Sequence, residues 1–235
     1  IETKLVALLC LKLGIHSADP KIVGGDDAPD GAIKYQVSLQ NVGSHFCVQR
    51  NNEHIITLWV AVGINKLSDK GTEYTPDKVI IHEKFDRKLF TNDISLVKIE
   101  PGIELNDRVN PVGLPTTNTD SGATLTLTGW GRISSDGPLP NKLQIVEVTS
   151  ITTKQCKMKY KSFKQPITPS HLCTHAPPRE GSCQGDSGGP LVTNGTLAAL
   201  VSWGTRSCGH SQVHPDVNTR VYSFVDWIKD TMSKN

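Results

Sequence analysis

One glycine-rich stretch in the last quarter of the chain constrains the fold and the chemistry more than any other. It runs from Gly181 to Pro190 and reads Gly-Ser-Cys-Gln-Gly-Asp-Ser-Gly-Gly-Pro. The stretch has no helical periodicity and too many glycines for the interior of a strand. Its glycines and proline favour a tight, irregular backbone in which successive N–H groups can form one concavity that suits an oxyanion. We therefore predict a nucleophile at Ser187 and oxyanion donors in the N–H groups of Gly185 and Ser187.

A glycine-rich surface turn is the alternative explanation of this stretch. Against it, Cys183 precedes the serine, and the run from Pro190 to Val192 enters a predicted strand. With these flanks the stretch resembles the active-site segment of the chymotrypsin-like (trypsin-like) serine proteases. The resemblance extends from Ile22 to the C-terminus, with one gap after Cys47. It implies an all-β fold of two packed antiparallel six-stranded β-barrels with a C-terminal α-helix, the first barrel being shortened by a deletion.

The composition fits this fold class and excludes others. The chain has 235 residues, of which 37% are hydrophobic, enough for one large β domain or two small ones. Its 20 glycines and 14 prolines favour many short strands. The net charge is only +2 and the basic residues are scattered, so nothing indicates a nucleic acid partner. The sequence shows no metal-ligand motif, nucleotide loop, repeat or transmembrane helix, and we expect no metal or other cofactor.

The N-terminal segment has the character of a targeting signal. An apolar run from Leu5 to Leu11 follows Lys4, is far too short to span a bilayer, and is followed by small residues that suit cleavage. We predict a signal peptide at residues 1–18, and therefore a secreted, extracellular protein in which disulfides are plausible. Lys12 interrupts the apolar run, and a short buried strand or helix is the alternative.

Residues 19–21 are interpreted as an activation propeptide. Lys21 is followed by Ile-Val-Gly-Gly, which resembles the activation site of the family. The resemblance implies that cleavage after Lys21 by a trypsin-like protease frees the amino group of Ile22, which then pairs with Asp186. A buried ammonium group needs a buried carboxylate, so this pair would order the loop that carries Gly185 and Ser187.

Local patterns place the remaining elements. Alternating polar and apolar residues predict strands from Tyr35 onward. Residues 22–235 form the protease domain, with the first barrel at about 22–115, the second at about 116–222 and the C-terminal helix at about 223–234, where the apolar spacing is helical. Asn194-Gly195 predicts a hairpin, and Asn194 also begins a glycosylation sequon.

The segment after Cys47 departs from the family pattern. Members of the family carry the catalytic histidine in an Ala-Ala-His-Cys segment, but here Thr57 is followed by Leu58-Trp59. Asp93, at the start of an alternating strand, matches the carboxylate that orients this histidine, so the acid is present and the base is absent. The other histidines lie away from this position, and we expect solvated surface side chains: His45, His54, His82, His171, His175, His210 and His214.

The cysteine count agrees with a missing segment. The chain has six cysteines, and removal of Cys10 with the signal peptide leaves an odd number. The resemblance implies the bridges Cys156–Cys173 and Cys183–Cys208. Cys47 is then unpaired, because its partner in the family stands beside the catalytic histidine.

The specificity pocket is also placed by resemblance. Gly181 takes the position at which trypsins carry an aspartate, and the other expected pocket residues are Ser182, Ser202, Trp203, Gly204 and Asp216. Ser202 to Gly204 resembles the edge segment that pairs with a substrate backbone. An open pocket between glycines suits aromatic or large aliphatic side chains. A carboxylate at Asp216 could instead accept a basic residue, unless it is turned away from the pocket.

The implied function is that of a secreted chymotrypsin-like serine endopeptidase, which hydrolyses peptide bonds through an acyl-enzyme at Ser187 and is impaired in this chain. A non-catalytic homologue that binds peptides or protein partners through the same cleft is the alternative. A third explanation of the missing segment is that this chain is a splice form or comes from a defective gene model of a normal enzyme. The expected partners are protein or peptide substrates, an activating trypsin-like protease and protein inhibitors. We expect no nucleic acid, no membrane and a monomer.

Overall fold

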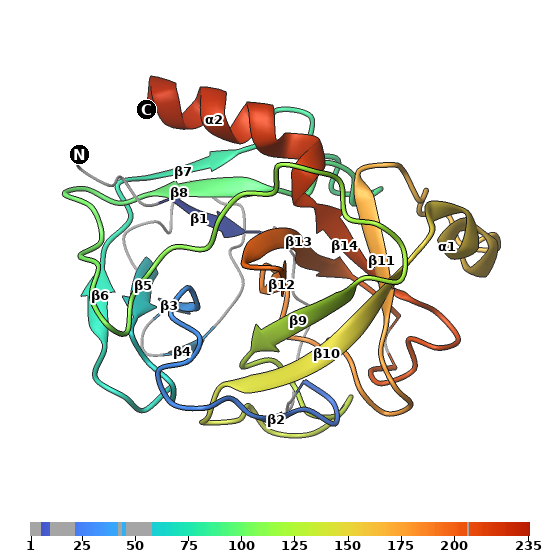
Figure 1. Cartoon of the computed structure of the whole chain (residues 1–235), viewed down its shortest axis with the longest axis horizontal. Coiled ribbons are helices and arrows are strands. Elements are labelled where there is room, and N and C mark those ends of the chain that lie inside the picture. The colour runs from blue at the N-terminus through green and yellow to red at the C-terminus, as the bar shows by residue number, and fades with distance from the viewer. Residues whose placement is uncertain (1–5, 10–21, 42–43, 46–57, 206) are drawn as a thin grey trace.

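The computed structural model describes residues 6–9, 22–41, 44–45, 58–205 and 207–235. Lys21 and Cys47 lie outside the described residues, so the predictions about them are not tested. The elements, shown in Figure 1, are β1 (Val6–Leu9), β2 (Asp26–Asp27), β3 (Val37–Asn41), β4 (Ser44–His45), β5 (Leu58–Val62), β6 (Thr72–Tyr74), β7 (Lys78–Ile81), β8 (Ser95–Lys98), β9 (Thr124–Gly129), β10 (Gln144–Ile151), α1 (Thr153–Lys159), β11 (His171–His175), β12 (Pro190–Thr193), β13 (Thr196–Trp203), β14 (Asp216–Arg220), η2 (Val221–Phe224) and α2 (Val225–Lys234).

The second half of the chain forms a closed six-stranded antiparallel barrel. The strands follow the order β11-β14-β13-β12-β9-β10, and β10 pairs again with β11 to close the ring. Alternate residues of β10 are buried, as expected for a strand with one face on a core. β2 adds to the free side of β10, so residues 26–27 belong with this sheet rather than with the first half. The barrel confirms the predicted all-β class.

The first half of the chain contributes two open sheets within the described residues. One has the order β1-β8-β7 and the other β4-β3-β5-β6. Apolar side chains of both sheets meet in one core cluster that contains Leu39, Val60, Val62, Val97 and Ile99. A second six-stranded barrel and its shortening by a deletion stay predictions.

The strand β1 lies inside the stretch predicted to be a signal peptide. It pairs with β8 in antiparallel register, from Val6 opposite Lys98 to Leu9 opposite Ser95 (Figure 1). A short strand was the alternative that the sequence left open. Removal of residues 1–18 from the mature protein stays a prediction.

The C-terminal helix packs against the first half of the chain. α2 lies along β7 and β8 in Figure 1, and Phe224 and Ile228 share a core cluster with Leu96 of β8 and Leu200 of β13. This cluster joins the two halves and confirms the predicted terminal helix. Within the described residues, no helix is long and apolar enough to cross a membrane, and no group of three His, Cys, Asp or Glu residues is placed to hold a metal ion.

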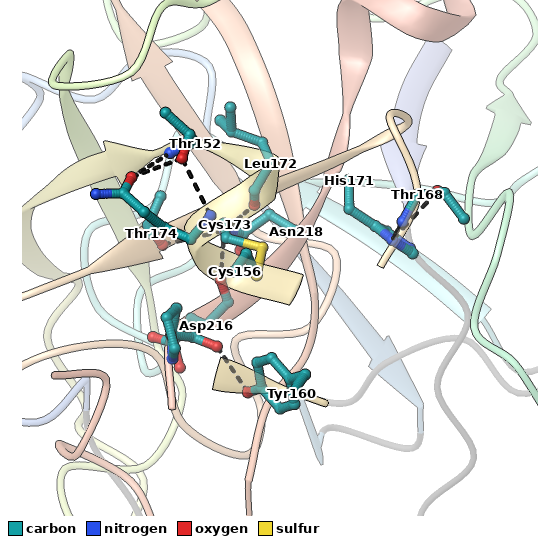
Figure 2. The surroundings of a disulfide bond; sticks show 12 residues. Thr152, Cys156, Tyr160, Thr168, His171, Leu172, Cys173, Thr174, Asp216 and Asn218 are labelled. Atoms are coloured by element: carbon teal, nitrogen blue, oxygen red, sulfur yellow. Dashed lines mark hydrogen bonds between the residues drawn. A yellow bond between two sulfur atoms is a disulfide. The ribbon is translucent and has the colours of Figure 1, made fainter. Parts of the chain in front are cut away.

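A second helix, α1, was not predicted from the sequence. It has only seven residues, and its signal is a capping box: the Thr152 hydroxyl accepts the Gln155 N–H at 3.1 Å, and the Gln155 side chain accepts the Thr152 N–H at 3.0 Å. The bridge Cys156–Cys173 ties α1 to β11 (Figure 2), and the other predicted bridge, Cys183–Cys208, is also present. Both disulfide predictions are confirmed.

The hairpin predicted at Asn194-Gly195 is also confirmed. These residues connect β12 to β13 and both adopt a left-handed backbone, with φ of 48° and 72°. Asparagine and glycine are the residues that tolerate this conformation best, which is why the pair is a reliable sequence signal.

The cap of α1 gives a test of the fold. We expect Thr152→Ala to lower the free energy of unfolding by about 1 kcal/mol, because the Gln155 N–H loses its acceptor. Thr152→Ser keeps a hydroxyl at the same place and should lose much less. Urea unfolding of both variants measures the difference, and equal losses would show that the hydroxyl does not act as a cap.

Candidate active site

Asp93 lies where the two halves of the chain meet. Its side chain is 1% exposed and accepts a hydrogen bond from the Ser202 hydroxyl at 2.6 Å. The Thr219 hydroxyl donates to the Asp93 carbonyl at 2.8 Å. Ser202 and Thr219 belong to β13 and β14 of the barrel, whereas Asp93 lies two residues before β8 of the first half. The predicted catalytic acid is therefore buried, and two strands of the barrel hold it in place.

The loop that carries Ser187 has the irregular backbone expected from its glycines. Gly185 and Gly188 have φ of 97° and 84°, a region that other residues rarely adopt. The Gly188 N–H donates to the carbonyl of Val201 at 2.8 Å, which anchors the loop on β13. Ser187 is partly exposed and lines the same pocket as Ser202. The structure thus brings the predicted nucleophile to the strand whose serine holds Asp93.

Asp186, the predicted partner of the Ile22 amino group, points into the protein. It is 2% exposed and accepts the N–H groups of Gly131 at 2.8 Å and Cys183 at 3.0 Å. A Cβ atom at Gly131 would overlap the carboxyl group of Asp186, and one at Gly129 would do the same. These two glycines, which the sequence analysis did not identify as site residues, make room for the acid.

Ile22 and Val23 lie against the barrel beside this loop. The Ile22 side chain is fully buried in the barrel core with Leu125 and Leu127. Val23 and Gly181 exchange two backbone hydrogen bonds, each of 3.1 Å. The segment after the predicted cleavage site is therefore paired with the stretch that leads into the Ser187 loop.

One pocket gathers most of the residues predicted for the specificity pocket. Ser187 lines it together with five of the six expected residues, namely Ser182, Ser202, Trp203, Gly204 and Asp216. The sixth expected residue, Gly181, does not line the pocket itself but lies behind the carboxyl group of Asp216.

The Asp216 carboxyl group occupies the space between two glycines. A Cβ atom at Gly181 would lie 3.1 Å from Oδ2 of Asp216, and one at Gly204 would lie 3.2 Å from Oδ1. The Ser182 N–H donates to Oδ2 at 3.1 Å. Asp216 is among the residues that line the pocket, while its Oδ2 is engaged by the Ser182 backbone.

Aromatic side chains surround Trp203 on one side of the pocket. Tyr160 meets Trp203 edge to face with ring centroids 5.0 Å apart, and Phe90 lies 6.4 Å from it. The Tyr160 hydroxyl donates to the carbonyl of Pro215 at 2.7 Å, next to Asp216 (Figure 2). Burial raises the pKa of Tyr160, and the negative charge of Asp216 raises it further. Tyr160 and Phe90 were not predicted as site residues, because only their contacts with Trp203 associate them with the pocket.

Two histidines differ from the expected solvated surface side chains. His171 is 2% exposed; its Nδ1 accepts the Thr168 N–H, and its Nε2 lies 3.1 Å from the Phe90 carbonyl, to which it donates. His82 is 8% exposed and packs against Phe224 and Trp227. Burial lowers the pKa of both imidazoles. Their expected exposure is wrong, and the side chains of His45 and His54 lie outside the described part of the chain.

Comparisons with known proteins agree with this geometry. The family model described as Trypsin matches residues 22–228. The chain belongs to the trypsin family of serine proteases. Chymotrypsin-2 of Vespa crabro is 38% identical over 88% of this chain and 98% of its own length, and Trypsin I-P1 of Gallus gallus is 37% identical over 92% and 91%. The solved structure of neuropsin, a serine protease of mouse brain, matches 90% of this chain and 100% of its own with a TM-score of 0.81 at 26% identity.

Two backbone N–H groups hold the buried carboxyl group of Asp186, and Gly131 leaves the room that this carboxyl group fills. We expect Gly131→Ala to lower the free energy of unfolding by about 2 kcal/mol or more, because the new methyl displaces Asp186 from two N–H groups. The control is Gly113→Ala, whose Cβ would meet nothing closer than 3.4 Å. Urea unfolding compares the two. A loss at Gly113 as large as that at Gly131 would contradict this role of the glycine.

The effect of the Asp216 charge on ligand affinity should be measurable. We expect Asp216→Asn to weaken binding of benzamidine about tenfold, or about 1.4 kcal/mol, because the cation loses a partly buried opposite charge. The neutral analogue benzamide should bind both forms alike, and Asp226→Asn, on the exposed face of α2, is the matched control. Calorimetric titration measures the affinities. Equal losses for benzamidine and benzamide would mean that the variant changes the shape of the pocket instead.

Proposed function

We propose that this chain is a secreted, zymogen-type endopeptidase of the trypsin family whose cleft binds an extended peptide and whose hydrolysis is impaired. The observation that carries the proposal is the meeting of Ser187 and Ser202 in one pocket, with the Ser202 hydroxyl bonded to the buried Asp93. This arrangement supports Ser187 as the nucleophile and Asp93 as the orienting acid of a serine protease site. The two disulfides are consistent with an extracellular protein.

Hydrolysis would proceed through an acyl-enzyme. The Ser187 oxygen attacks the peptide carbonyl, the N–H groups of Gly185 and Ser187 stabilise the oxyanion, and the amine departs with a proton. Water then attacks the ester, which releases the carboxylic acid and returns the proton to the serine. Each proton transfer needs a general base, and a serine hydroxyl is a weak nucleophile without one.

The sequence provides no Ala-Ala-His-Cys segment to supply that base. In a serine protease of another fold, removal of the histidine alone costs about as much as removal of the whole triad, roughly 10⁶ in turnover. Substrate binding and the oxyanion site remain, and they accelerate hydrolysis about 10³- to 10⁴-fold over the uncatalysed reaction in water. We therefore infer a small residual rate or none.

Activation is proposed to follow cleavage after Lys21. Ile22 is buried and Val23 is paired with Gly181, and this position supports the formation of an ion pair between a freed Ile22 amino group and Asp186. An activating trypsin-like protease and protein inhibitors are the implied partners, and the proposed form is a monomer.

The proposed substrates carry a bulky apolar side chain before the scissile bond. Position 181 carries glycine where trypsins carry an aspartate, and the similar protein of Vespa crabro is named a chymotrypsin. Asp216 gives the same pocket a secondary affinity for basic side chains.

Active-site labelling tests the proposed impairment. We expect the chain, cut after Lys21, to react with a fluorophosphonate probe at least about a thousandfold more slowly than a variant with Ala-Ala-His-Cys inserted after Thr57, because only the variant has a base. Mass spectrometry of the Ser187 peptide measures the labelling, and Ser187→Ala in the repaired chain is the control.

Rapid labelling of the unrepaired chain, lost in Ser187→Ala, would show that another group activates the serine. If neither chain is labelled but both bind a product peptide that ends in a bulky apolar residue, the non-catalytic homologue becomes the better description.

A further inference from the structure

One segment of the second half carries positive charge without any negative charge. Between Glu147 and Glu180 the sequence has no aspartate or glutamate, yet it has five lysines within eleven residues, which we call the lysine cluster: Lys154, Lys157, Lys159, Lys161 and Lys164. Because the net charge of the whole chain is only +2, this local excess is not visible in the composition. Basic residues are scattered over the rest of the chain, but this segment departs from that pattern.

The lysine cluster is exposed on a segment whose other side is firmly attached to the protein. All five lysines are exposed, whereas Cys156 and Tyr160, which lie between them in the sequence, are buried. The disulfide to Cys173 and the ring contact of Tyr160 with Trp203 hold this segment in place. α1 lies at the outer edge of the molecule (Figure 1), so a large ligand can reach its exposed side.

The lysine cluster has no acidic partner within the described residues. None of its five ammonium groups forms an ion pair there with a carboxylate. Residues 207–214, which contact the same segment, bring no acid either. The contacts are a hydrogen bond of 3.4 Å from the Lys159 ammonium group to the Gln212 carbonyl, and the rings of Phe163 and His214 at 5.2 Å. An ordinary solvated surface has charges of both signs interspersed, and this one does not.

Helix stability does not explain the lysine cluster. The helix dipole favours cations in the last turn, which accounts for Lys157 and Lys159. It disfavours Lys154 in the first turn, and Lys161 and Lys164 lie beyond the end of α1. Like charges at this spacing also repel one another. A bound anion would relieve that repulsion, so the charge pattern suits a ligand better than it suits the fold.

The residue type indicates the kind of anion. Arginine is typical where one carboxylate or phosphate is held in a planar, bidentate pair, whereas a lysine ammonium group is a point charge on a flexible stem. A cluster of five lysines without an arginine therefore suits a flexible polymer with many anionic groups. Outside the cell, sulfated polysaccharides have this chemistry.

We propose that the lysine cluster is a binding site for a sulfated polysaccharide of the glycosaminoglycan class, separate from the peptide cleft. Lysine side chains of the cluster do not line the pocket beside Ser187, so the site does not depend on catalysis. The choice of a sulfated polysaccharide over a nucleic acid rests on the proposed extracellular location. Binding would retain the protein on sulfated surfaces and leave the pocket free for a peptide.

The experiment titrates the purified full chain with a fluorescent heparin decasaccharide and follows the anisotropy. We expect the affinity to fall about a hundredfold when Lys157, Lys161 and Lys164 are all changed to Gln, since each cation contributes to the attraction. This variant leaves the bond from Lys159 to Gln212 in place. The affinity of the unchanged chain should fall about tenfold or more as the NaCl concentration rises from about 50 to 200 mM, because bound cations release counterions.

Two matched controls separate charge from other effects of the substitutions. Arg at the same three positions keeps the charge and should keep the affinity within about threefold of the unchanged chain. Gln at three exposed lysines elsewhere, namely Lys66, Lys70 and Lys229, removes the same net charge and should have a similarly small effect. Far-ultraviolet circular dichroism during heating verifies that all three variants are folded.

Two results would overturn the proposal. One is a folded Gln variant of the cluster that binds the decasaccharide as tightly as the unchanged chain, or no more weakly than the variant of the three remote lysines. The other is tighter binding of a DNA duplex of equal charge, which would assign the cluster to nucleic acid. If the chain is not exported from secretory cells but its cluster binds the decasaccharide, the proposed location is wrong and the binding site is supported.

Discussion

The hydrogen bond from Ser202 to the buried carboxyl group of Asp93 fixes how the two halves of this protein meet. A carboxyl group that is 1% exposed is costly unless its oxygen atoms have donors, and one donor comes from β13, 109 residues further along the chain. Thr219 of β14 holds the backbone of the same residue. Any sliding of the barrel against the first half would break both bonds, so the fold and the position of the proposed catalytic acid are determined together.

Asp186 is a second buried acid whose carboxyl group is stabilised by hydrogen bonds. Its carboxyl group is buried and accepts two backbone N–H groups, one of them from Gly131, 55 residues earlier in the sequence. This arrangement needs glycine at positions 129 and 131, since a methyl group at either would fill the space of the carboxyl group. The Gly-Trp-Gly turn and the Ser187 loop are therefore one structure, although neither contains a local signal for the other.

Local signals explain what the sequence predicted well. The hairpin at Asn194, the strands and the terminal helix depend on residues close together in the chain, and the disulfides followed from the family pattern. The errors concern contacts between distant residues. His171 donates to the carbonyl of Phe90, 81 residues earlier, and His82 packs against Phe224 near the terminal helix, so neither contact is visible in the neighbouring sequence. Strand order is a long-range property too, so the pairing of β2 with β10 and of β1 with β8 was not foreseen.

The pocket and the proposed nucleophile come from the second half of the chain, and the proposed catalytic acid comes from the first. Every residue that lines the pocket comes from the second half, where the barrel is closed and both disulfides lie. The first half contributes Asp93 and, in the family pattern, the histidine that this sequence lacks. A change confined to the first half therefore acts on the proton transfers and on the sheet around β8, while the pocket keeps its walls. The proposed loss of hydrolysis with retained peptide binding would follow from that division, because the missing base belongs to the first half and the pocket walls to the second.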